Sequence, residues 1–370
     1  MSVALKQQQL QAHKYILNHD IMNCTAEGVA GNHLYSGRAL GISEPWDIVQ
    51  LHPDLQPLMN DIVSHYKRVG LSCSQNIIWD LSLKHLGAHI SFHPSVFYYG
   101  PDENQYWGDY DWKRVVSIIN SKNNFIRLAS HLGTDVPYTM CFDDVTEIPV
   151  CFADIIYPCY LKAAVSVAGV GIFRCQNQQE LEQAMQTFEP NVPVQIQEEI
   201  IAETFLNLQY IVSDGDCVRL AASEQILDGF AHQGNRVPAS HEPWQAVDDM
   251  ASWLVRNGMK GIFAFDVAVV RTPFGPRYTA IECNPRYNGA TYPTLIAQKL
   301  GITEWCALTF DTRHRSLATI DLDNIEYDPY TGQGVILVNW GTVLAGKLSL
   351  LLAGSLSHQK SLAVELESRL

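Results

Sequence analysis

The sequence has few features of an exported or membrane-bound protein. Residues 1–20 are polar and lack the apolar core of a signal peptide. The longest apolar run near the C-terminus, KLSLLLAG, is far shorter than the about 20 residues that a membrane-spanning helix needs. The nine cysteines are scattered and never form a C-x-x-C pair, so neither a disulfide framework nor a zinc cage is indicated. We therefore expect a cytoplasmic protein with reduced cysteines and no membrane partner.

Clusters of basic residues are missing as well. The formal net charge is -14, and no run of Lys and Arg could follow a phosphate backbone, so we expect no nucleic-acid partner. Charged residues make up 17% of the chain and apolar residues 47%, which excludes a disordered protein. The length of 370 residues favours two or three domains with well-buried sheets.

Several common catalytic motifs are absent. No Lys-Ser or Lys-Thr pair follows the glycines of SVAGVGI, so the Walker A spacing is missing, and there is no G-x-S-x-G elbow. His85, His89 and His93 recur at every fourth residue, but Gly87 interrupts the helix that would align them. We therefore expect no metal at these histidines, and the chemistry has to come from other polar groups.

The order of helix and strand patterns predicts an α/β protein. Residues 1–120 alternate short apolar and helical stretches, and residues 113–133 are typical of one helix that ends at Gly133. From about residue 150 the pattern changes to strands and hairpins, including a turn at 214–216. Residues 334–355 predict a further hairpin, which is compatible with the core or with an edge that pairs with a second subunit, and residues 357–370 predict a closing helix.

Two neighbouring strands carry polar groups that are costly to bury alone. Asp266 interrupts the apolar run FAFDVAV, and the next strand ends in IECNPR with Glu282 and Asn284. Because alternate side chains of a strand share a face, we expect Tyr278, Ala280, Glu282 and Asn284 to point the same way. The turn TPFGPR would bring Asp266 beside them.

Two carboxylates and an amide in one place suit Mg²⁺, which prefers one or two carboxylates together with substrate phosphates. The alternative is that the two acids form structural ion pairs. The candidate partners for such pairs are Arg271, Arg277 and Arg286.

Two upstream segments could hold a nucleotide. Lys162 lies in a strand-like run before a small-residue loop, and such a lysine can reach polyphosphate oxygens while the loop closes over them. The strand VPVQIQEEI ends in Glu198 and Glu199, where an adenine could find an apolar slot and an acceptor. Each feature alone is also compatible with an ordinary surface turn or a solvated acid.

Taken together and in order, these segments resemble the ATP-grasp superfamily over residues 115–305. The similarity is greatest to its carboxylate-amine ligases, relatives of D-alanine-D-alanine ligase and biotin carboxylase. It rests on six pieces: Lys122 in NSKNNFIRLA, Lys162 in YPCYLKAA, the loop SVAGVG, the strand end IQEEI, Asp266 in FAFDVAV, and IECNPRYNGA.

The resemblance implies an ATP-grasp fold in three parts. A pre-ATP-grasp α/β domain would cover residues 1–118. The ATP-grasp domain would cover 119–310, with a small lobe at about 150–200 and a large lobe at 201–310. Residues 311–370 would complete the large lobe.

The resemblance also implies roles for individual residues. Lys122 and Lys162 would contact ATP phosphates, under a loop that contains Ser166, Gly169 and Gly171. Glu198 would bind the adenine amino group, the backbone of Glu199 to Ile201 would form the hinge, and Glu203 would receive a ribose hydroxyl. Asp266, Glu282 and Asn284 would hold Mg²⁺ or Mn²⁺. Arg286 would face the acyl phosphate or the substrate carboxylate, with Arg219 and Arg236 as further candidates.

Enzymes of this kind join a carboxylate to an amine through an acyl phosphate and release ADP and phosphate. We therefore expect small-molecule carboxylate and amine substrates, with an amino acid or a peptide among them, and a homodimer is compatible with the predicted hairpin edge. The alternatives are an ATP-grasp kinase and a non-catalytic ATP-binding module.

Overall fold

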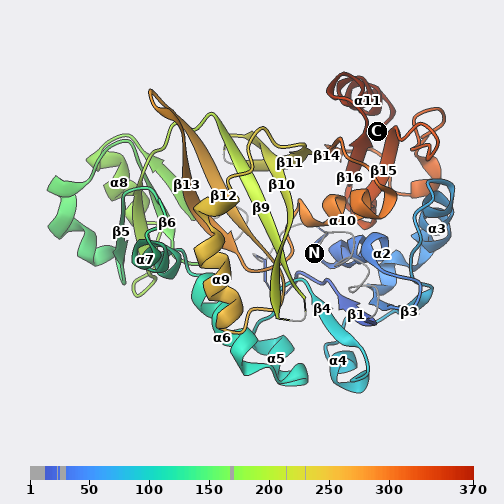
Figure 1. The fold of residues 1–370 in the computed structure, drawn as a ribbon, viewed down its shortest axis with the longest axis horizontal. Coiled ribbons are helices and arrows are strands. Elements are labelled where there is room, and N and C mark those ends of the chain that lie inside the picture. Colours follow the sequence, from blue (N-terminus) through green and yellow to red (C-terminus); the bar gives the residue numbers. More distant parts are fainter. Residues whose placement is uncertain (1–12, 23, 26–30, 167–170, 214, 230) are drawn as a thin grey trace.

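The computed structural model describes residues 13–22, 24–25, 31–166, 171–213, 215–229 and 231–370 (Figure 1). These residues form three sheets with helices packed around them, so the predicted α/β class is confirmed. The strand orders are β3-β2-β1-β4 in the first sheet, β5-β8-β6-β7 in the second, and β13-β12-β9-β10-β11-β14-β16-β15 in the third.

The N-terminal sheet is parallel. Its strands are β1 (Tyr15–Asn18), β2 (Ile48–Gln50), β3 (Asn76–Ile78) and β4 (His93–Val96). The accompanying helices are α2 (Ala39–Ile42), α3 (Met59–Arg68), α4 (Lys84–Ala88) and α5 (Pro101–Trp107). Because β1 lies between β2 and β4, the carboxyl ends of β1 and β4 lie side by side, which is where parallel sheets commonly bind ligands.

The single helix that we predicted over 113–133 is two helices. They are α6 (Tyr110–Ile119) and α7 (Lys122–Leu132). The chain breaks because Ser121 adopts an extended backbone and its hydroxyl accepts a hydrogen bond from the Asn124 N–H, as an N-cap does. Gly133 ends α7 with a left-handed φ of 72°, as expected. The break places Lys122 in the first turn of α7.

The second sheet forms a small lobe. Its strands are β5 (Thr139–Phe142), β6 (Cys159–Ala163), β7 (Ile172–Cys175) and β8 (Val194–Glu198), all paired antiparallel, and α8 (Gln178–Met185) packs against them. Because β5 pairs with β8, this lobe begins before the limit of about 150 that we expected.

The third sheet carries the two predicted hairpins. They are β9 (Thr204–Ser213) with β10 (Asp216–Asp228), and β12 (Gly261–Thr272) with β13 (Gly275–Asn284), and β11 (Ala231–Val237) follows β10. Helix α9 (Asp248–Arg256) covers one face of this sheet (Figure 1). Apolar residues of this helix and of the turn before it are buried there, namely Trp244, Val247, Met250, Ala251 and Leu254.

The C-terminal strands extend the third sheet. β14 (Trp305–Asp311) pairs with β16 (Lys347–Ala353), and β16 pairs with β15 (Gly334–Asn339). Helix α10 (Thr291–Leu300) precedes these strands and α11 (Leu356–Arg369) ends the chain. Every residue of β15 is buried, which favours the core alternative for this hairpin over an edge open to a second subunit. Within the described residues, no helix combines the length and apolarity needed to cross a membrane.

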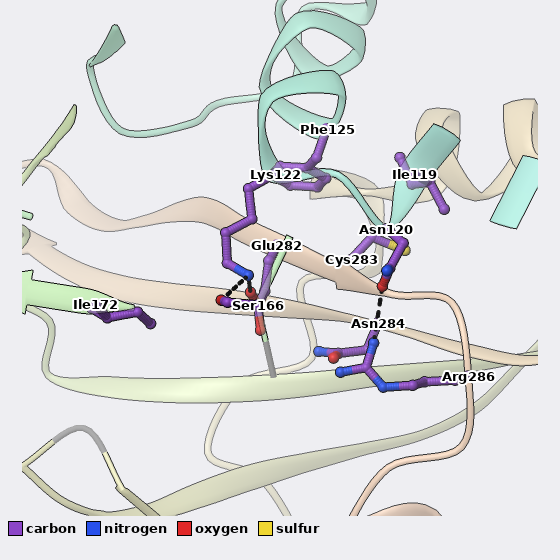
Figure 2. Close-up of a pocket in the computed structure, with 10 residues that line it drawn as sticks. All are labelled: Ile119, Asn120, Lys122, Phe125, Ser166, Ile172, Glu282, Cys283, Asn284 and Arg286. Atoms are coloured by element: carbon purple, nitrogen blue, oxygen red, sulfur yellow. Dashed lines mark hydrogen bonds and ion pairs between the residues drawn. The ribbon is translucent and has the colours of Figure 1, made fainter. Parts of the chain in front are cut away.

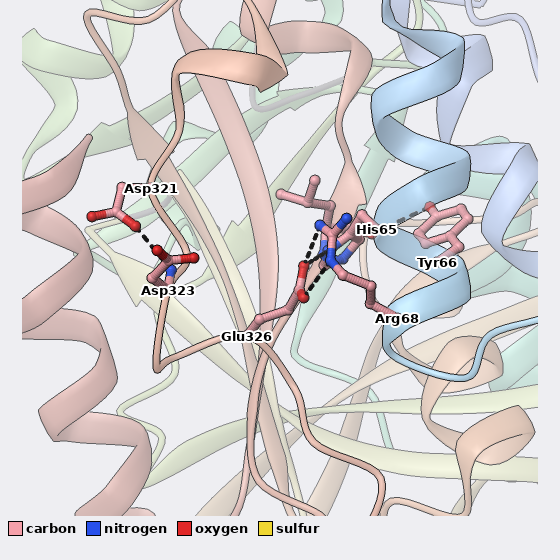
Figure 3. A network of polar contacts seen from close by, with 7 residues as sticks. His65, Tyr66, Arg68, Asp321, Asp323 and Glu326 are labelled. Carbon is pink, nitrogen blue, oxygen red and sulfur yellow. Dashed lines mark hydrogen bonds and ion pairs between the residues drawn. The ribbon is translucent and has the colours of Figure 1, made fainter.

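A polar network joins the N-terminal domain to these strands (Figure 3). His65 and Arg68 of α3 both bind Glu326: His65 Nδ1 lies 2.6 Å from Oε1, and Arg68 donates two hydrogen bonds of 2.7 Å. His65 Nε2 accepts a hydrogen bond of 3.0 Å from the Leu337 N–H, so the ring proton is on Nδ1 and points at Glu326.

Candidate active site

The pairing of β12 with β13 brings the polar side chains of the two strands together. Asp266 lies opposite Glu282, as the sequence predicted. A β-bulge follows this pair, because Val267 is opposite Ala280 and Ile281 is the extra residue. Our prediction that Ala280 and Tyr278 share a face with Glu282 is therefore wrong.

The bulge reverses the alternation of side chains along β13. Ala280 and Cys283 lie in the same apolar core, and Tyr278 packs against it. Glu282 and Asn284 face the other way, towards the pocket that both residues line. Nothing in the apolar pattern of the sequence indicates the extra residue, and bulges are common beside active sites.

Three side-chain amides hold the Asp266 carboxylate. Asn284 Nδ2 donates to Oδ2 at 3.0 Å, while Asn207 Nδ2 and Gln225 Nε2 donate to Oδ1 at 2.7 and 2.6 Å. Burial and the neighbouring Glu282 carboxylate raise the pKa of Asp266 to about 7. Asn207 and Gln225 were not among the predicted site residues. Asn207 lies between two leucines, where an amide is costly to bury without a partner, but Gln225 follows Ser223 and Glu224 in a more polar strand.

Lys122, at the start of α7, points towards Glu282 and Ser166 (Figure 2). Its Nζ is 3.3 Å from Glu282 Oε2 and donates a hydrogen bond of 3.1 Å to Ser166 Oγ. Burial alone would raise the pKa of Glu282, but the cations Lys122, Arg286 and Lys162 lower it. The structure therefore brings a carboxylate that stays ionised against a set of cations.

Lys162 on β6 is partly buried, and its charge acts on Glu282. Its Nζ donates a hydrogen bond of 2.6 Å to Gln197 Oε1, and Gln197 in turn donates to Thr139 Oγ1. Burial lowers the pKa of Lys162 to about 8, although Glu282 acts in the opposite direction. A lysine with so little hydration needs a nearby anion to stay charged, and a phosphate would provide it.

Arg286 closes the other end of the same pocket (Figure 2). Its Nη1 donates a hydrogen bond of 3.2 Å to Asn120 Oδ1, and its backbone forms an isolated bridge with Tyr98 of the N-terminal domain. The pocket is thus lined by five of the residues predicted to bind phosphate, metal or carboxylate, while Lys162 and Asp266 are not part of its lining. Its polar lining is Asn120, Lys122, Ser166, Glu282, Asn284 and Arg286.

Arg271 and Arg277, which were candidate ion-pair partners of Asp266 and Glu282, pair with other acids. Arg271 pairs with Glu203 at 2.7 Å, and Arg277 lies 3.5 Å from Asp135. Neither of these two arginines approaches Asp266 or Glu282 within the ion-pair distance.

A second pocket lies where the small lobe joins the third sheet. Its lining is Glu198, Glu199, Ile200, Ile201, Ala202, Glu203, Val270, Arg271 and Arg277, which includes the predicted adenine and hinge residues. Ile201 is 87% exposed, and its N–H makes no hydrogen bond with any described residue. A nucleotide base could therefore use this backbone.

The side chains at the hinge are already engaged. Glu198 accepts a hydrogen bond of 2.9 Å from the Tyr138 N–H. Hydrogen bonds from Arg174 and Tyr160 lower the pKa of Glu199 to about 2. Glu199 can therefore offer a ligand its backbone, while its carboxylate belongs to the small lobe.

The predicted loop over the phosphates is described only at its two ends. Ser166 lies at one end, and Gly171 at the other has a left-handed φ of 73°. The Gly171 carbonyl accepts a hydrogen bond of 3.0 Å from the Ala163 N–H. Gly169 is outside the described residues.

The two further arginines lie away from the pocket, contrary to expectation. Arg219 pairs with Asp248 of α9 and stands opposite Tyr210, on the helix-covered face of the sheet. Arg236 is one residue beyond Asn235, which pairs with Gln225. Because Gln225 faces Asp266, the alternation of the strand turns Arg236 away from it. The spacing of residues in the sequence did not show to which face of the sheet these two side chains point.

Comparison with known proteins identifies this arrangement. Residues 119–290 match the family described as ATP-grasp domain. Phosphoribosylamine-glycine ligase from Thermotoga maritima has a similar structure, with a TM-score of 0.60 at 13% identity over 96% of each chain. The ADP complex of N5-carboxyaminoimidazole ribonucleotide synthetase gives 0.57 at 10% identity over 95% of each chain.

A third solved structure carries its ligands in the crystal. The biotin carboxylase domain of 2-oxoglutarate carboxylase from Hydrogenobacter thermophilus, with MgADP, ADP and bicarbonate, gives a TM-score of 0.54 at 14% identity. The match covers 92% of this chain and 86% of that one. No curated protein matches the chain in sequence. At these identities the likeness is one of fold.

Proposed function

Because residues 119–290 match the ATP-grasp domain family, as the motifs indicated, we propose that this chain is an ATP-dependent carboxylate-amine ligase. The reaction would form an amide or peptide bond through an acyl phosphate and release ADP and phosphate. One observation carries the proposal: Lys122, Arg286, Glu282 and Asn284 line a single pocket, with Asp266 hydrogen-bonded to Asn284 behind it. Phosphoryl chemistry needs this combination of cations and metal-binding oxygens.

ATP would span the two pockets. Its base would lie at the hinge, against the backbone of Glu199 to Ile201, and its ribose near Glu203. The phosphates would reach Lys122, which contacts Glu282, and Lys162, whose charge acts on Glu282. Burial of Lys162 prepares this position for an anion, because a phosphate would restore the charge that desolvation disfavours.

Asp266, Glu282 and Asn284 fit a Mg²⁺ or Mn²⁺ ion. They offer two carboxylates and an amide oxygen, which are the hard ligands that Mg²⁺ takes together with phosphate oxygens. The two carboxylates face each other across the strands, and their repulsion contributes to the raised pKa of Asp266. A divalent cation would offset that repulsion, and when bound it would neutralise charge on the phosphates.

Arg286 would orient the carboxylate substrate. Its guanidinium lies at the end of the pocket beside Asn120, and a planar fork of donors suits a carboxylate or an acyl phosphate. The protein would act by positioning and by neutralising charge, without a covalent nucleophile. Cys283, the cysteine that lines this pocket, is buried, and burial raises its pKa well above the usual range, so its thiol is inert.

A third pocket beyond Arg286 supports an amino acid as substrate. It lies at the carboxyl ends of β1 and β4 and contains three acidic residues. The lining is Asn18, Asp20, Cys24, Leu83, Tyr98, Gly100, Pro101, Asp102 and Glu103. Tyr98 joins this pocket to the first one, because its backbone pairs with that of Arg286.

Charges of both signs surround Cys24 in this third pocket. Burial is the main reason why the pKa of Cys24 rises to about 12. The charged groups that act on its thiol are Arg286 and Arg38, and the opposing carboxylates Glu103 and Asp20. Cations on one side and carboxylates on the other match the carboxylate and ammonium groups of an amino acid, so we propose an amino acid or a small peptide as a substrate.

Arg38 strengthens this assignment. It is 7% exposed and packs against the rings of Tyr35, Phe97 and Tyr292. Its Nε and Nη2 have no hydrogen-bond partner among the described residues. A buried guanidinium without a carboxylate partner is costly, and a substrate anion would supply the missing contact.

Nucleotide and mass analysis tests the proposed function. The protein would be incubated with ATP, Mg²⁺ and pooled amino acids, with the Glu282→Gln variant as control. The ligase predicts ADP, free phosphate and a product one water lighter than its two substrates combined. A product heavier by one phosphoryl group, without free phosphate, would instead identify a kinase. ATP binding without turnover of any pool would leave only a non-catalytic module.

A further inference from the structure

Two histidines and an aspartate gather on the N-terminal domain, away from the residues of the proposed ligase. His33 lies in the 3₁₀ helix Asn32–Arg38, His52 precedes the 3₁₀ helix Pro53–Leu58, and Asp54 is in the first turn of that helix. One nitrogen from each histidine and one oxygen of Asp54 lie within 4.8 Å of one another. The sequence separates His33 from the other two, so only the fold brings the three together.

The spacing of these atoms is that of ligands around an ion. His33 Nε2 is 3.2 Å and His52 Nδ1 is 3.6 Å from the same oxygen, Asp54 Oδ2. Tetrahedral Zn²⁺ with bonds of about 2.1 Å separates neighbouring ligand atoms by about 3.4 Å. Both observed distances lie close to that value and exceed the about 2.8 Å of a good charge-assisted hydrogen bond.

The alternative is a pair of surface histidine-carboxylate salt bridges. His65 and His85 in this protein show what such contacts look like, with hydrogen bonds to a carboxylate oxygen at 2.6 and 2.8 Å. His33 makes no such hydrogen bond to Asp54, although it lies near enough. His52 Nδ1 accepts a hydrogen bond from the Asp54 N–H, so it carries a lone pair and no proton, and it cannot donate to the carboxylate as a salt bridge would require.

We propose that His33, His52 and Asp54 bind a divalent transition-metal ion, Zn²⁺ by ligand type. Two imidazole nitrogens and one carboxylate suit zinc, whereas the proposed Mg²⁺ site offers only oxygen. His52 Nδ1 now accepts a hydrogen bond of 3.2 Å from the Asp54 N–H, and the ion would take over this lone pair. The rings lie edge to face, with centroids 4.6 Å apart, so each can present a nitrogen without a clash.

The three side chains are accessible to solvent, so an ion could reach them and keep a water molecule as a fourth ligand. The three side chains are 36%, 27% and 57% exposed, in the order His33, His52 and Asp54. Asp54 also lines a surface depression with Gln56 and Leu344. Three protein ligands and an open fourth position are the pattern of accessible zinc sites.

The site neighbours the pocket to which we assign the amino acid. Both histidines act electrostatically on Asp20, which lines that pocket. A bound ion would therefore place positive charge near one wall of the pocket. Binding of the ion itself does not depend on the ligase activity.

Cobalt titration of the full-length, metal-free protein tests this proposal. Co²⁺ replaces Zn²⁺ and gives a visible absorption band in a tetrahedral nitrogen-oxygen site, whereas cysteine ligation would add a thiolate charge-transfer band in the near ultraviolet. The variants are His33→Ala with His52→Ala, and Asp54→Asn alone. The matched control removes another histidine pair, His85 and His89, whose rings are 6.4 Å apart. Glu282→Gln controls for the Mg²⁺ site.

We expect one equivalent of Co²⁺, displaced by Zn²⁺, in the wild type, in the His85 and His89 control and in Glu282→Gln. The His33 and His52 double variant should lose the band. Asp54→Asn should weaken binding by more than about 100-fold, since loss of an outer-shell partner alone costs about 10- to 100-fold. Unchanged uptake in the double variant, a thiolate band, or no tetrahedral band in the wild type would each overturn the proposal. Circular dichroism of each variant shows whether it has folded.

Discussion

Replacing Glu326 by Gln should destabilise the protein at neutral pH and leave it less sensitive to acid. Glu326 accepts hydrogen bonds from His65 and Arg68, and its side chain is 20% exposed. Burial alone would raise its pKa, but these two partners outweigh burial and lower the pKa from 4.5 to about 2. A depression of that size corresponds to about 3 kcal/mol of stability in the ionised state.

The sign of the pH dependence follows from the direction of the shift. Because the folded pKa lies below the unfolded value, the contribution is fully present above pH 4.5 and is lost as the pH falls towards 2. Burial also lowers the pKa of His65, so protonation of this histidine in the unfolded state adds to the loss of stability in acid. Both groups therefore make the folded protein sensitive to acid.

Urea unfolding between pH 7 and pH 3.5 measures the effect. We expect Glu326→Gln to lose about 3 kcal/mol at pH 7, with a gap to the wild type that narrows as the pH falls below 4.5. Asp323→Asn is the control, because it removes the same charge from an exposed neighbour in the same segment. Equal free energies of unfolding at pH 7, or a gap that does not narrow in acid, would refute this account of the network.

Three further predictions concern the proposed site. Glu282→Gln should lower the turnover of ATP by about 100-fold or more through loss of the metal, and full activity in this variant would contradict the assignment. At pH 8.5, ATP binding should take up as much as about one proton, because phosphate raises the pKa of Lys162 from about 8, and Lys162→Met should abolish this uptake in calorimetry with two buffers. Arg286→Lys should lower kcat with little change in the KM for ATP, and a change confined to the KM for ATP would place Arg286 on the nucleotide instead.

The sequence predicted which residues belong to the site better than it predicted where their side chains point. Asp266 and Glu282 could be found because each interrupts an apolar strand, and burying such a group requires a partner. The bulge at Ile281 could not be found, because one extra residue leaves no trace in the pattern and yet reverses the faces of Ala280 and Tyr278.

Long-range neighbours were also beyond the sequence. Gln225 and Asn207 reach Asp266 only because β9 lies between β10 and β12, and strand order is set by the whole sheet. Arg219 and Arg236 were chosen as basic residues in a suitable region, but the alternation along their strands turns both away from the pocket. The break of the helix before Lys122 had a local signal, the capping serine, which the helical periodicity on both sides obscured.

Transfer of oxygen from carboxylate to phosphate tests the central claim most directly. Pooled amino acids labelled with ¹⁸O in their carboxyl groups would be incubated with the protein, ATP and Mg²⁺, and the released phosphate analysed by mass spectrometry. An acyl phosphate predicts one ¹⁸O atom in each phosphate released, and no labelled phosphate from the Glu282→Gln variant. Amide product accompanied only by unlabelled phosphate would contradict the acyl-phosphate mechanism.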